Sequence, residues 1–377
     1  MTTTAPPGGS GARWTSPTGE LREKRINAPV FETPFRSRGN RVAGTLAFPD
    51  RVWERGRIAR RLFAMALVAV GFGIDARLAS AATNAPPGTR DKIEKSFHVR
   101  PGGVLKFDAD LANAEIITGD SDTVRIELIR EFKVATAEEA NALRQKLTLE
   151  LGQVDVTTTG ENSVKVTVRL ADDRNGTNRR KMRLHFRITM PRKFNLELRT
   201  GGSATVGDLD GWAKARTEGG SLKFGSVSGE VTAKSEGGSV TMGNVGGNLE
   251  ARSEGGSATI GRVNGRVVAT AEGGSVSIEE ATDAISARAE GGSVKAWISR
   301  QPHTDSKITA EAGNIDLRLN ASVAVNVDAA CTAGRLSSDF NVDRHQVDNP
   351  GRLKSAINGG GPLVLLRASA GNINLHK

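Results

Sequence analysis

An 18-residue pattern of apolar and polar positions repeats along the second half of the chain. Five copies of the tetrapeptide Glu-Gly-Gly-Ser begin at Glu218, Glu236, Glu254, Glu272 and Glu290. Thr200 opens a variant, Thr-Gly-Gly-Ser, 18 residues before the first copy. Spacing this strict is typical of a repeat architecture.

Within each unit the small and apolar positions fall two residues apart. In the unit that begins at Glu218 they are Leu222 with Phe224 and Val231 with Ala233, and Val227 lies between the two pairs. This alternation predicts at least two strands per unit, and glycines at the second, third, eighth and twelfth positions mark corners. One unit cannot bury its thin apolar face alone, so neighbours must stack about 4.8 Å apart. The predicted fold class is all-β, a β-solenoid of 18-residue coils.

The period loosens after Trp297. Residues 311–314 and 332–334 resemble degenerate corners, with a strand at Val323, Val325 and Val327, and residues 370–372 form a last corner before a closing strand. We therefore assign residues 200–377 to the solenoid.

The preceding segment, residues 82–199, predicts a strand-rich capping section whose strands follow one another as meanders. Its clearest alternations, residues 164–170 and 184–190, are expected to pair as a hairpin across a basic turn. One short helix is predicted, with Thr136 as its N-cap and Ala140, Leu143 and Leu147 on one face.

Composition limits what can hold this fold together. Aromatic residues are 4% of the chain, Tyr is absent and Cys331 is the single cysteine. The core must therefore consist of small side chains, and the chain can form neither an internal disulfide nor a thiolate metal site.

The net charge of +10 is concentrated at the beginning of the chain. Residues 1–81 hold 13 of the 52 basic and 6 of the 42 acidic residues, which leaves 39 and 36, a charge of only +3, for the remainder. Basic and acidic residues interleave there, so nucleic acid is not an expected partner.

An export signal is predicted at residues 60–81. Arg60-Arg61 precedes an apolar stretch at residues 62–74, and Ala79-Ser80-Ala81 suits signal peptidase. Thirteen apolar residues span about 20 Å as a helix, short of the roughly 30 Å bilayer core, so cleavage near Ala82 is favoured over anchoring. Contact with the membrane is expected only through this signal.

Residues 1–59, which precede the signal, are predicted to be disordered. Either they form a long leader or translation starts near Val52.

Charged residues occupy two columns on the outside of the predicted coils. Basic residues stand two positions before four of the five glutamates of the corner motif. The resulting ladder comprises Arg216, Lys234, Arg252, Arg288, Glu218, Glu236, Glu254, Glu272 and Glu290. It is interpreted as a determinant of register and solubility or as a surface for interaction. A calcium site along the glutamates is disfavoured because the adjacent cations compete.

No catalytic constellation is recognised. The five histidines lack metal-ligand spacing, Cys331 has no neighbouring histidine, and His303 with Asp305 and His345 with Asp343 are pairs that arise easily by chance. No enzyme activity, metal or cofactor is expected.

Three passages resemble a known family. They are residues 97–107, residues 188–202 and residues 357–375. Over residues 94–377 the chain is similar to the bacterial putative adhesin domain, a family of unknown function in exported and envelope proteins. The resemblance implies a solenoid fold and carries over no catalytic residues.

The expected function is that of a non-enzymatic exported protein, periplasmic or on the cell surface, that binds envelope polymer or protein. The first alternative is a polymerising, bactofilin-like scaffold, in which open solenoid ends stack head to tail. The second is a carbohydrate-active β-helix enzyme.

Overall fold

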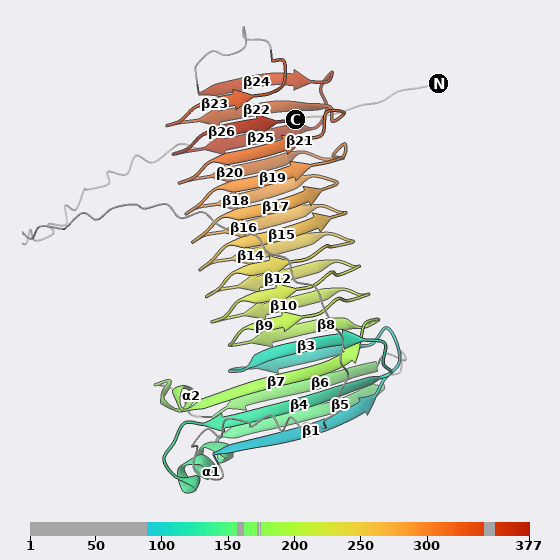
Figure 1. Ribbon diagram of the computed structural model, residues 1–377, viewed down its shortest axis with the longest axis vertical. Coiled ribbons are helices and arrows are strands. Elements are labelled where there is room, and N and C mark those ends of the chain that lie inside the picture. The colour runs from blue at the N-terminus through green and yellow to red at the C-terminus, as the bar shows by residue number, and fades with distance from the viewer. Residues whose placement is uncertain (1–88, 157–161, 172, 174, 343–350) are drawn as a thin grey trace, which may run out of the picture. The chain divides into compact units, whose positions relative to one another are not determined.

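A computed structural model describes residues 89–156, 162–171, 173, 175–342 and 351–377, all within one unit, Leu78–Lys377. These residues form two sheets of thirteen strands each (Figure 1). The all-β solenoid is confirmed. The predicted leader and signal peptide lie outside the described residues. Of the two helices that are described, neither has the length and apolarity needed to cross a bilayer.

The spatial order of the strands in each sheet differs from their order in the chain. From one edge to the other, sheet A contains β1 (Arg90–His98), β4 (Thr123–Phe132), β7 (Met182–Pro191), β3 (Asn113–Gly119), β9 (Ala204–Val206), β11 (Leu222–Phe224), β13 (Val240–Met242), β15 (Ala258–Val263), β17 (Val276–Ala281), β19 (Val294–Ile298), β21 (Ile315–Leu319), β26 (Ile373–His376) and β23 (Leu336–Ser338). Sheet B contains β5 (Leu147–Val156), β6 (Asn162–Leu170), β2 (Val104–Ala109), β8 (Asn195–Thr200), β10 (Ala213–Thr217), β12 (Val231–Ser235), β14 (Leu249–Ser253), β16 (Val267–Ala271), β18 (Ile285–Ala289), β20 (Ser306–Ala310), β25 (Leu363–Ala368), β22 (Val325–Cys331) and β24 (Arg352–Ile357).

Each regular coil contributes one strand to each sheet. Successive coils pair in parallel with an offset of 18 residues, as in Leu222 with Val240 and Val231 with Leu249. The predicted inward columns are buried between the sheets, and the tenth column forms a third, single-residue ladder through Val227 and Val245. Small inward side chains such as Ala233 keep this interior narrow.

One buried column was not predicted. Thr217, Ser235 and Ser253 end their strands with side chains that are almost fully buried. The Ser235 hydroxyl donates to the carbonyl oxygens of Gly220 and Gly238, at 2.8 and 2.9 Å, which satisfies the hydroxyl and ties two corners together.

The assignment of Thr200 to the glutamate column is wrong. Thr200 pairs in register with Thr217, not with Glu218, because the coil from Leu196 to Ala213 is 17 residues long. The Thr200 side chain is buried and its hydroxyl donates to the Ala112 carbonyl at 2.6 Å. The first corner therefore lacks the exposed acidic position.

The N-terminal strands extend the same two sheets in an order that differs from the chain order. Strands β2 and β3 form one rung, a layer of the stack with one strand in each sheet. This rung lies between the rungs β6–β7 and β8–β9, and it pairs in parallel with the strands of both. The predicted hairpin of β6 with β7 is wrong, since the two strands lie in different sheets, and the meander is replaced by parallel pairing. Only the outermost strands, β1 on β4, β4 on β7 and β5 on β6, pair antiparallel.

The predicted helix is α1 (Ala137–Gln145). Thr136 caps it by accepting a hydrogen bond from the Glu139 amide, and Ala140 and Leu143 are buried. Leu147 is not on this helix but begins β5. The basic turn contains a second helix, α2 (Thr177–Arg180), with no buried residue.

The C-terminal strands are also inserted out of order. The rung β25–β26 lies between β20–β21 and β22–β23, with parallel pairing on both sides. The strand expected after residues 370–372 is confirmed as β26, but it lies inside sheet A and not at its edge. Antiparallel β24 forms the outer edge of sheet B, and β23 forms that of sheet A.

Candidate binding surface on the outer face of sheet B

The ladder predicted from the sequence lies on sheet B and its adjoining corner. Arg216, Lys234 and Arg252 are direct neighbours on β10, β12 and β14 and point away from the core. Thr270 then interrupts the basic column before Arg288. The outer face thus presents a row of cations along the stack, beside the row of corner glutamates.

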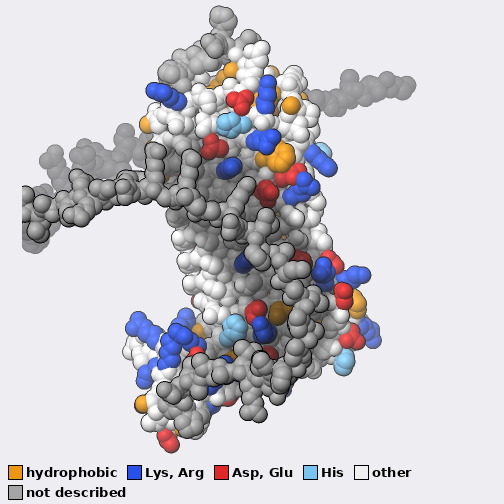
Figure 2. All heavy atoms as spheres, in the orientation of Figure 1, with side chains coloured by type: hydrophobic (Ala, Val, Ile, Leu, Met, Phe, Trp, Pro, Cys, Tyr) orange, Lys and Arg blue, Asp and Glu red, His pale blue; other side chains and the backbone are white. Residues whose placement is uncertain are grey.

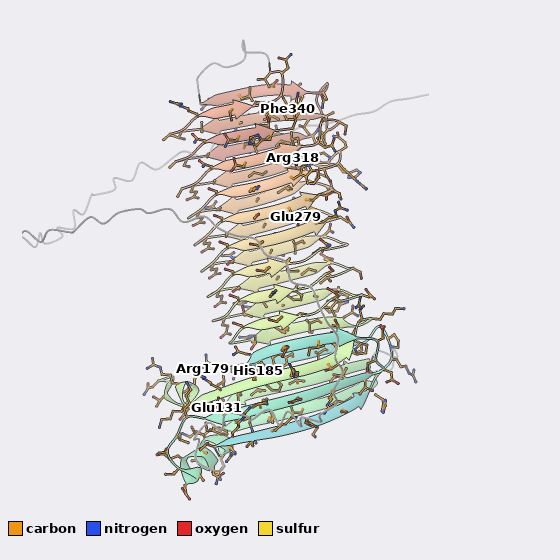
Figure 3. The ribbon with its side chains drawn as sticks, in the orientation of Figure 1. Glu131, Arg179, His185, Glu279, Arg318 and Phe340 are labelled. Carbon is orange, nitrogen blue, oxygen red and sulfur yellow. The ribbon has the colours of Figure 1, made fainter. Side chains whose placement is uncertain are left out.

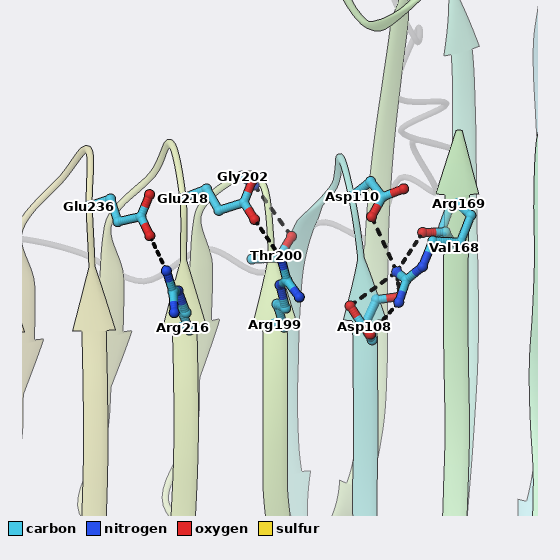
Figure 4. A network of polar contacts seen from close by, with 10 residues as sticks. All are labelled: Asp108, Asp110, Val168, Arg169, Arg199, Thr200, Gly202, Arg216, Glu218 and Glu236. Carbon is cyan, nitrogen blue, oxygen red and sulfur yellow. Dashed lines mark hydrogen bonds and ion pairs between the residues drawn. The ribbon is translucent and has the colours of Figure 1, made fainter. Parts of the chain in front are cut away.

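Most of these arginines bind a glutamate of the next coil. The closest guanidinium–carboxylate distances are 3.0 Å for Arg199 with Glu218, and 2.6 Å both for Arg252 with Glu272 and for Arg288 with Glu311. Arg216 pairs with Glu236 in the same way (Figure 4). The ladder therefore joins successive coils.

Two members depart from this scheme. Lys234 turns to Glu250 on the neighbouring strand, with its ammonium nitrogen 2.7 Å from the carboxylate. Glu290 is bound by Arg288 of its own coil at 3.0 Å, because Thr270 stands where the preceding cation would be. Every glutamate of the predicted ladder still has a cationic partner.

These pairs stabilise the ionised groups. The hydrogen bond and charge of Glu218 raise the pKa of Arg199 above its ordinary value. At the opposite corner, burial raises the pKa of Glu280, but hydrogen bonds from Ser299 and Arg262 outweigh it and hold that pKa below its usual value.

Because the pairs are exposed, we expect only a small effect from breaking one. Arg252→Ala should lower the free energy of unfolding by about 1 kcal/mol or less, and the loss should shrink at high salt. Thermal melting at low and high salt measures this. The control is Lys223→Ala on β11, a strand of the other sheet. An equal, equally salt-dependent loss in the control would contradict a role for the pair in joining coils.

A basic hollow of about 540 Å³ opens on the same face, over β6, β2, β8, β10 and β12. Its lining includes six basic and two acidic side chains. The basic residues are Lys106, Lys165, Arg199, Lys214, Arg216 and Lys234; the acidic residues are Asp108 and Glu197. Arg199, Arg216 and Lys234 are paired with glutamates outside the lining, so the positive charge that is left comes from the three lysines on β2, β6 and β10.

Part of this charge is not neutralised within the protein. Lys106 and Lys214 make no ion pair with any residue that the structure describes, and Lys165 reaches Glu150 only at 3.9 Å. The Thr167 hydroxyl oxygen, also in the lining, is buried and has no hydrogen-bond partner among the described residues. Uncompensated ammonium groups beside an unused hydroxyl are suited to bind an anion.

One edge of the hollow is fixed by a tight polar network. Arg169 on β6 binds Asp108 and also Asp110, with 3.3 Å between the guanidinium and the second carboxylate (Figure 4). Asp108 raises the pKa of Arg169 by a hydrogen bond. Because Arg169 binds Asp108, this carboxylate is less available to compete with a bound anion for the lysines of the hollow.

Sequence reasoning did not find this hollow. Lys106, Lys165 and Lys214 come from three distant segments, which the inserted rung β2–β3 brings onto one face. Lys106 lies directly beside Lys165, and Glu197 lies between Lys106 and Lys214. A periodic pattern in the sequence identifies neighbours only where chain order and rung order agree.

The histidines, their neighbouring aspartates and Cys331, which the sequence analysis considered as catalytic or metal-binding groups, do not come together in a site. His303 pairs with Asp283, its Nδ1 lying 3.3 Å from the carboxylate, while Asp305 accepts from the Leu363 amide. His345 and Asp343 lie outside the described residues. Cys331 is buried in β22. Within the described ranges, no three of His, Cys, Asp and Glu gather as a metal site would require.

A two-sheet parallel solenoid with capped ends and a charged outer face defines the class of this protein. The chain belongs to the Toastrack DUF4097 family, whose sequence model matches residues 144–376. The resemblance to a putative adhesin domain of unknown function is thereby confirmed.

Several solved structures are similar to the chain. A putative adhesin from Parabacteroides merdae has 11% identity and a TM-score of 0.32, covering 78% of this chain and 99% of its own. A putative adhesin from Bacteroides fragilis has 12% identity and a TM-score of 0.28, covering 77% and 99%. A putative lipid binding protein from Parabacteroides distasonis has 10% identity and a TM-score of 0.30, covering 76% and 97%. No curated protein matches the sequence.

Proposed function

We propose that this protein is a non-enzymatic, exported, adhesin-like binding protein of the bacterial envelope, and that its basic hollow holds an anionic polymer. The observation that carries the proposal is the excess of basic over acidic side chains, six to two, in that hollow. Export rests on the arginine-led apolar stretch and the small residues that follow it at residues 60–81.

The chemistry of the hollow favours a polymer over a small anion. Its cations come from five neighbouring strands, β6, β2, β8, β10 and β12, so they form rows along the stack with one rung roughly every 4.8 Å. A chain of regularly spaced carboxylates or phosphates can contact several rungs at once. Each contact is weak when exposed to solvent, and the sum is sensitive to salt.

Catalysis has less support than binding. A glycosidase needs a carboxylic acid whose pKa is raised. Each described carboxyl group with a clear shift has a lowered pKa instead: Asp91, Glu94, Glu280 and Asp283. For Asp91, burial raises the pKa, but Arg130 and Arg144 more than offset it.

Polymerisation into a scaffold is also less well supported. Head-to-tail stacking that continues the parallel coils is opposed at three of the four edge strands, because β1, β5 and β24 pair antiparallel with their inner neighbours and only β23 pairs in parallel. Strand β5 has a register shift between Leu151 and Val154, and β1 is rich in charged residues. Bulges and charges of this kind oppose strand addition.

Charge reversal in the hollow tests the proposal. We expect Lys106→Glu combined with Lys214→Glu to weaken binding to polygalacturonate or to polyphosphate about tenfold at low salt, with a smaller loss at high salt. Biolayer interferometry with each immobilised polymer gives the dissociation constants, and the two polymers separate carboxylate from phosphate recognition.

The matched control is Lys223→Glu combined with Lys295→Glu, two lysines on sheet A. It makes the same change in net charge on the other face of the solenoid. The proposal fails if the wild type binds neither polymer, or if the control loses as much affinity as the hollow variant.

A further inference from the structure

A second concave surface lies on the outer face of sheet A. One hollow of about 420 Å³ runs over β11 to β17, and another of about 630 Å³ lies over β17, β19, β21 and β26. Ser277 and Glu279 line both hollows, so the two join into one trough along the stack. Figure 3 shows Glu279 and Arg318 pointing outward from neighbouring parts of this face.

The first part of the trough is polar, and its charged lining residues are two carboxylates, Asp208 and Glu279. Gly225, Gly243 and Gly261 form its floor, because the absence of side chains leaves the backbone open. Hydroxyl and amide groups of Asn244, Thr259 and Ser277 line its sides. Such groups donate and accept hydrogen bonds without selecting a charge.

The second part contains an aromatic platform. Trp297 on β19 is partly exposed, and the guanidinium of Arg318 lies 5.0 Å from its ring centroid. The indole Nε1 is buried and has no hydrogen-bond partner among the described residues. A buried donor without an acceptor is rare in a folded protein and indicates a group that a ligand could satisfy.

Charges in this second part balance. Lys295, Arg318 and Lys377 face Glu279, Asp316 and Asp339, three of each sign. Two of the carboxylates are already engaged: Asp316 accepts from Asn374 at 2.6 Å, and Asp339 contacts the His376 ring at 3.2 Å. Figure 2 shows basic, acidic, histidine and apolar side chains gathered over the C-terminal strands. With Asp208 of the first part added, the trough has four acidic and three basic side chains, so unlike the basic hollow of sheet B it has no excess of positive charge to attract a polyanion.

We propose that the trough binds a neutral, hydroxyl-rich oligosaccharide whose sugar ring stacks on Trp297. The apolar face of a pyranose takes the position of the Arg318 guanidinium over the indole, and the displaced guanidinium becomes a donor to the sugar hydroxyls. The indole N–H, which has no partner among the described residues, donates to a sugar oxygen at the edge of the ring. The hydroxyl and amide groups along the glycine floor hold the following sugar units.

The test uses the full chain and a panel of neutral hexasaccharides of glucose, mannose, galactose and N-acetylglucosamine, with hexagalacturonate as the acidic member. Isothermal titration calorimetry and tryptophan fluorescence report binding. We expect at least one neutral hexamer to bind. Trp297→Ala should weaken that binding about tenfold, in line with the loss of one aromatic stacking contact, and leave any binding of hexagalacturonate unchanged.

Matched variants separate this site from general effects. Trp212→Ala removes another partly exposed tryptophan, which lies outside the trough, and should leave binding unchanged. Arg318→Ala uncovers the indole and should strengthen binding several-fold. If Trp297→Ala does not fold, Trp297→Phe retains an aromatic face and should retain most of the affinity.

The inference is overturned if no neutral hexamer binds the wild type, if Trp212→Ala weakens binding as much as Trp297→Ala, or if Arg318→Ala abolishes it. It stands apart from the proposed function, since the charge-reversed Lys106 and Lys214 variant should bind the neutral hexamer normally. Loss of polyanion binding with retained hexamer binding would leave this inference intact.

Discussion

Replacing Phe107 by alanine is expected to lower the free energy of unfolding by about 3–5 kcal/mol. Phe107 on β2 meets Phe186 on β7 edge to face, with ring centroids 5.0 Å apart, and both side chains are almost fully buried. The pair joins the two sheets in a close-packed core that includes Leu105, Ile188 and Phe194, so the neighbours can fill only part of the cavity. Denaturant unfolding followed by circular dichroism measures the loss.

Ile117→Ala is the control, because this neighbouring apolar side chain is 39% exposed. Its effect should stay within about 0.5 kcal/mol. A change below about 1 kcal/mol for Phe107→Ala would mean that the N-terminal rungs repack freely, contrary to a rigid connection between the sheets.

Gly220→Ala is expected to destabilise the solenoid by about 1–3 kcal/mol, although alanine adds only one methyl group. A Cβ atom at this corner would collide with the Ser203 nitrogen and lie 2.5 Å from the Gly202 carbonyl carbon of the coil beneath. Both obstacles are backbone, so the coils must separate to admit the methyl group. The same denaturant titration detects the shift.

Gly119→Ala provides the matched control, since a Cβ atom there meets no atom within 4 Å. We expect it to be neutral or slightly stabilising, because alanine restricts the unfolded chain. If the two alanine variants were equally stable, close stacking of the corners could not be the reason that the third position of each unit is glycine.

The 18-residue periodicity predicted the strands and corners of the regular coils well, because each equivalent position in successive units must meet the same physical requirement. Leu222 and Val231 must enter a narrow core, and the glycines must allow the next corner to approach. The same reasoning placed Thr200 wrongly, because identical spacing concealed a coil that is one residue shorter.

The ends of the stack were harder to predict. Alternation in residues 164–170 and 184–190 correctly indicated strands but carried no information about which strand pairs with which. Pairing there depends on the inserted rung β2–β3, a long-range choice that local patterns do not encode. The basic hollow, which depends on the same insertion, could not be predicted for the same reason.

The position of β25–β26 also has a consequence for the time course of folding. A chain that emerges from its N-terminal end can add coils one by one as far as β21, but β22 and β23 then have no completed rung on which to pair. That rung is made from residues 363–376, which come later in the chain than β22 and β23. This end of the stack therefore closes only after residues 363–376 are available, and removal of these residues takes out an internal layer of the stack, not its outer edge.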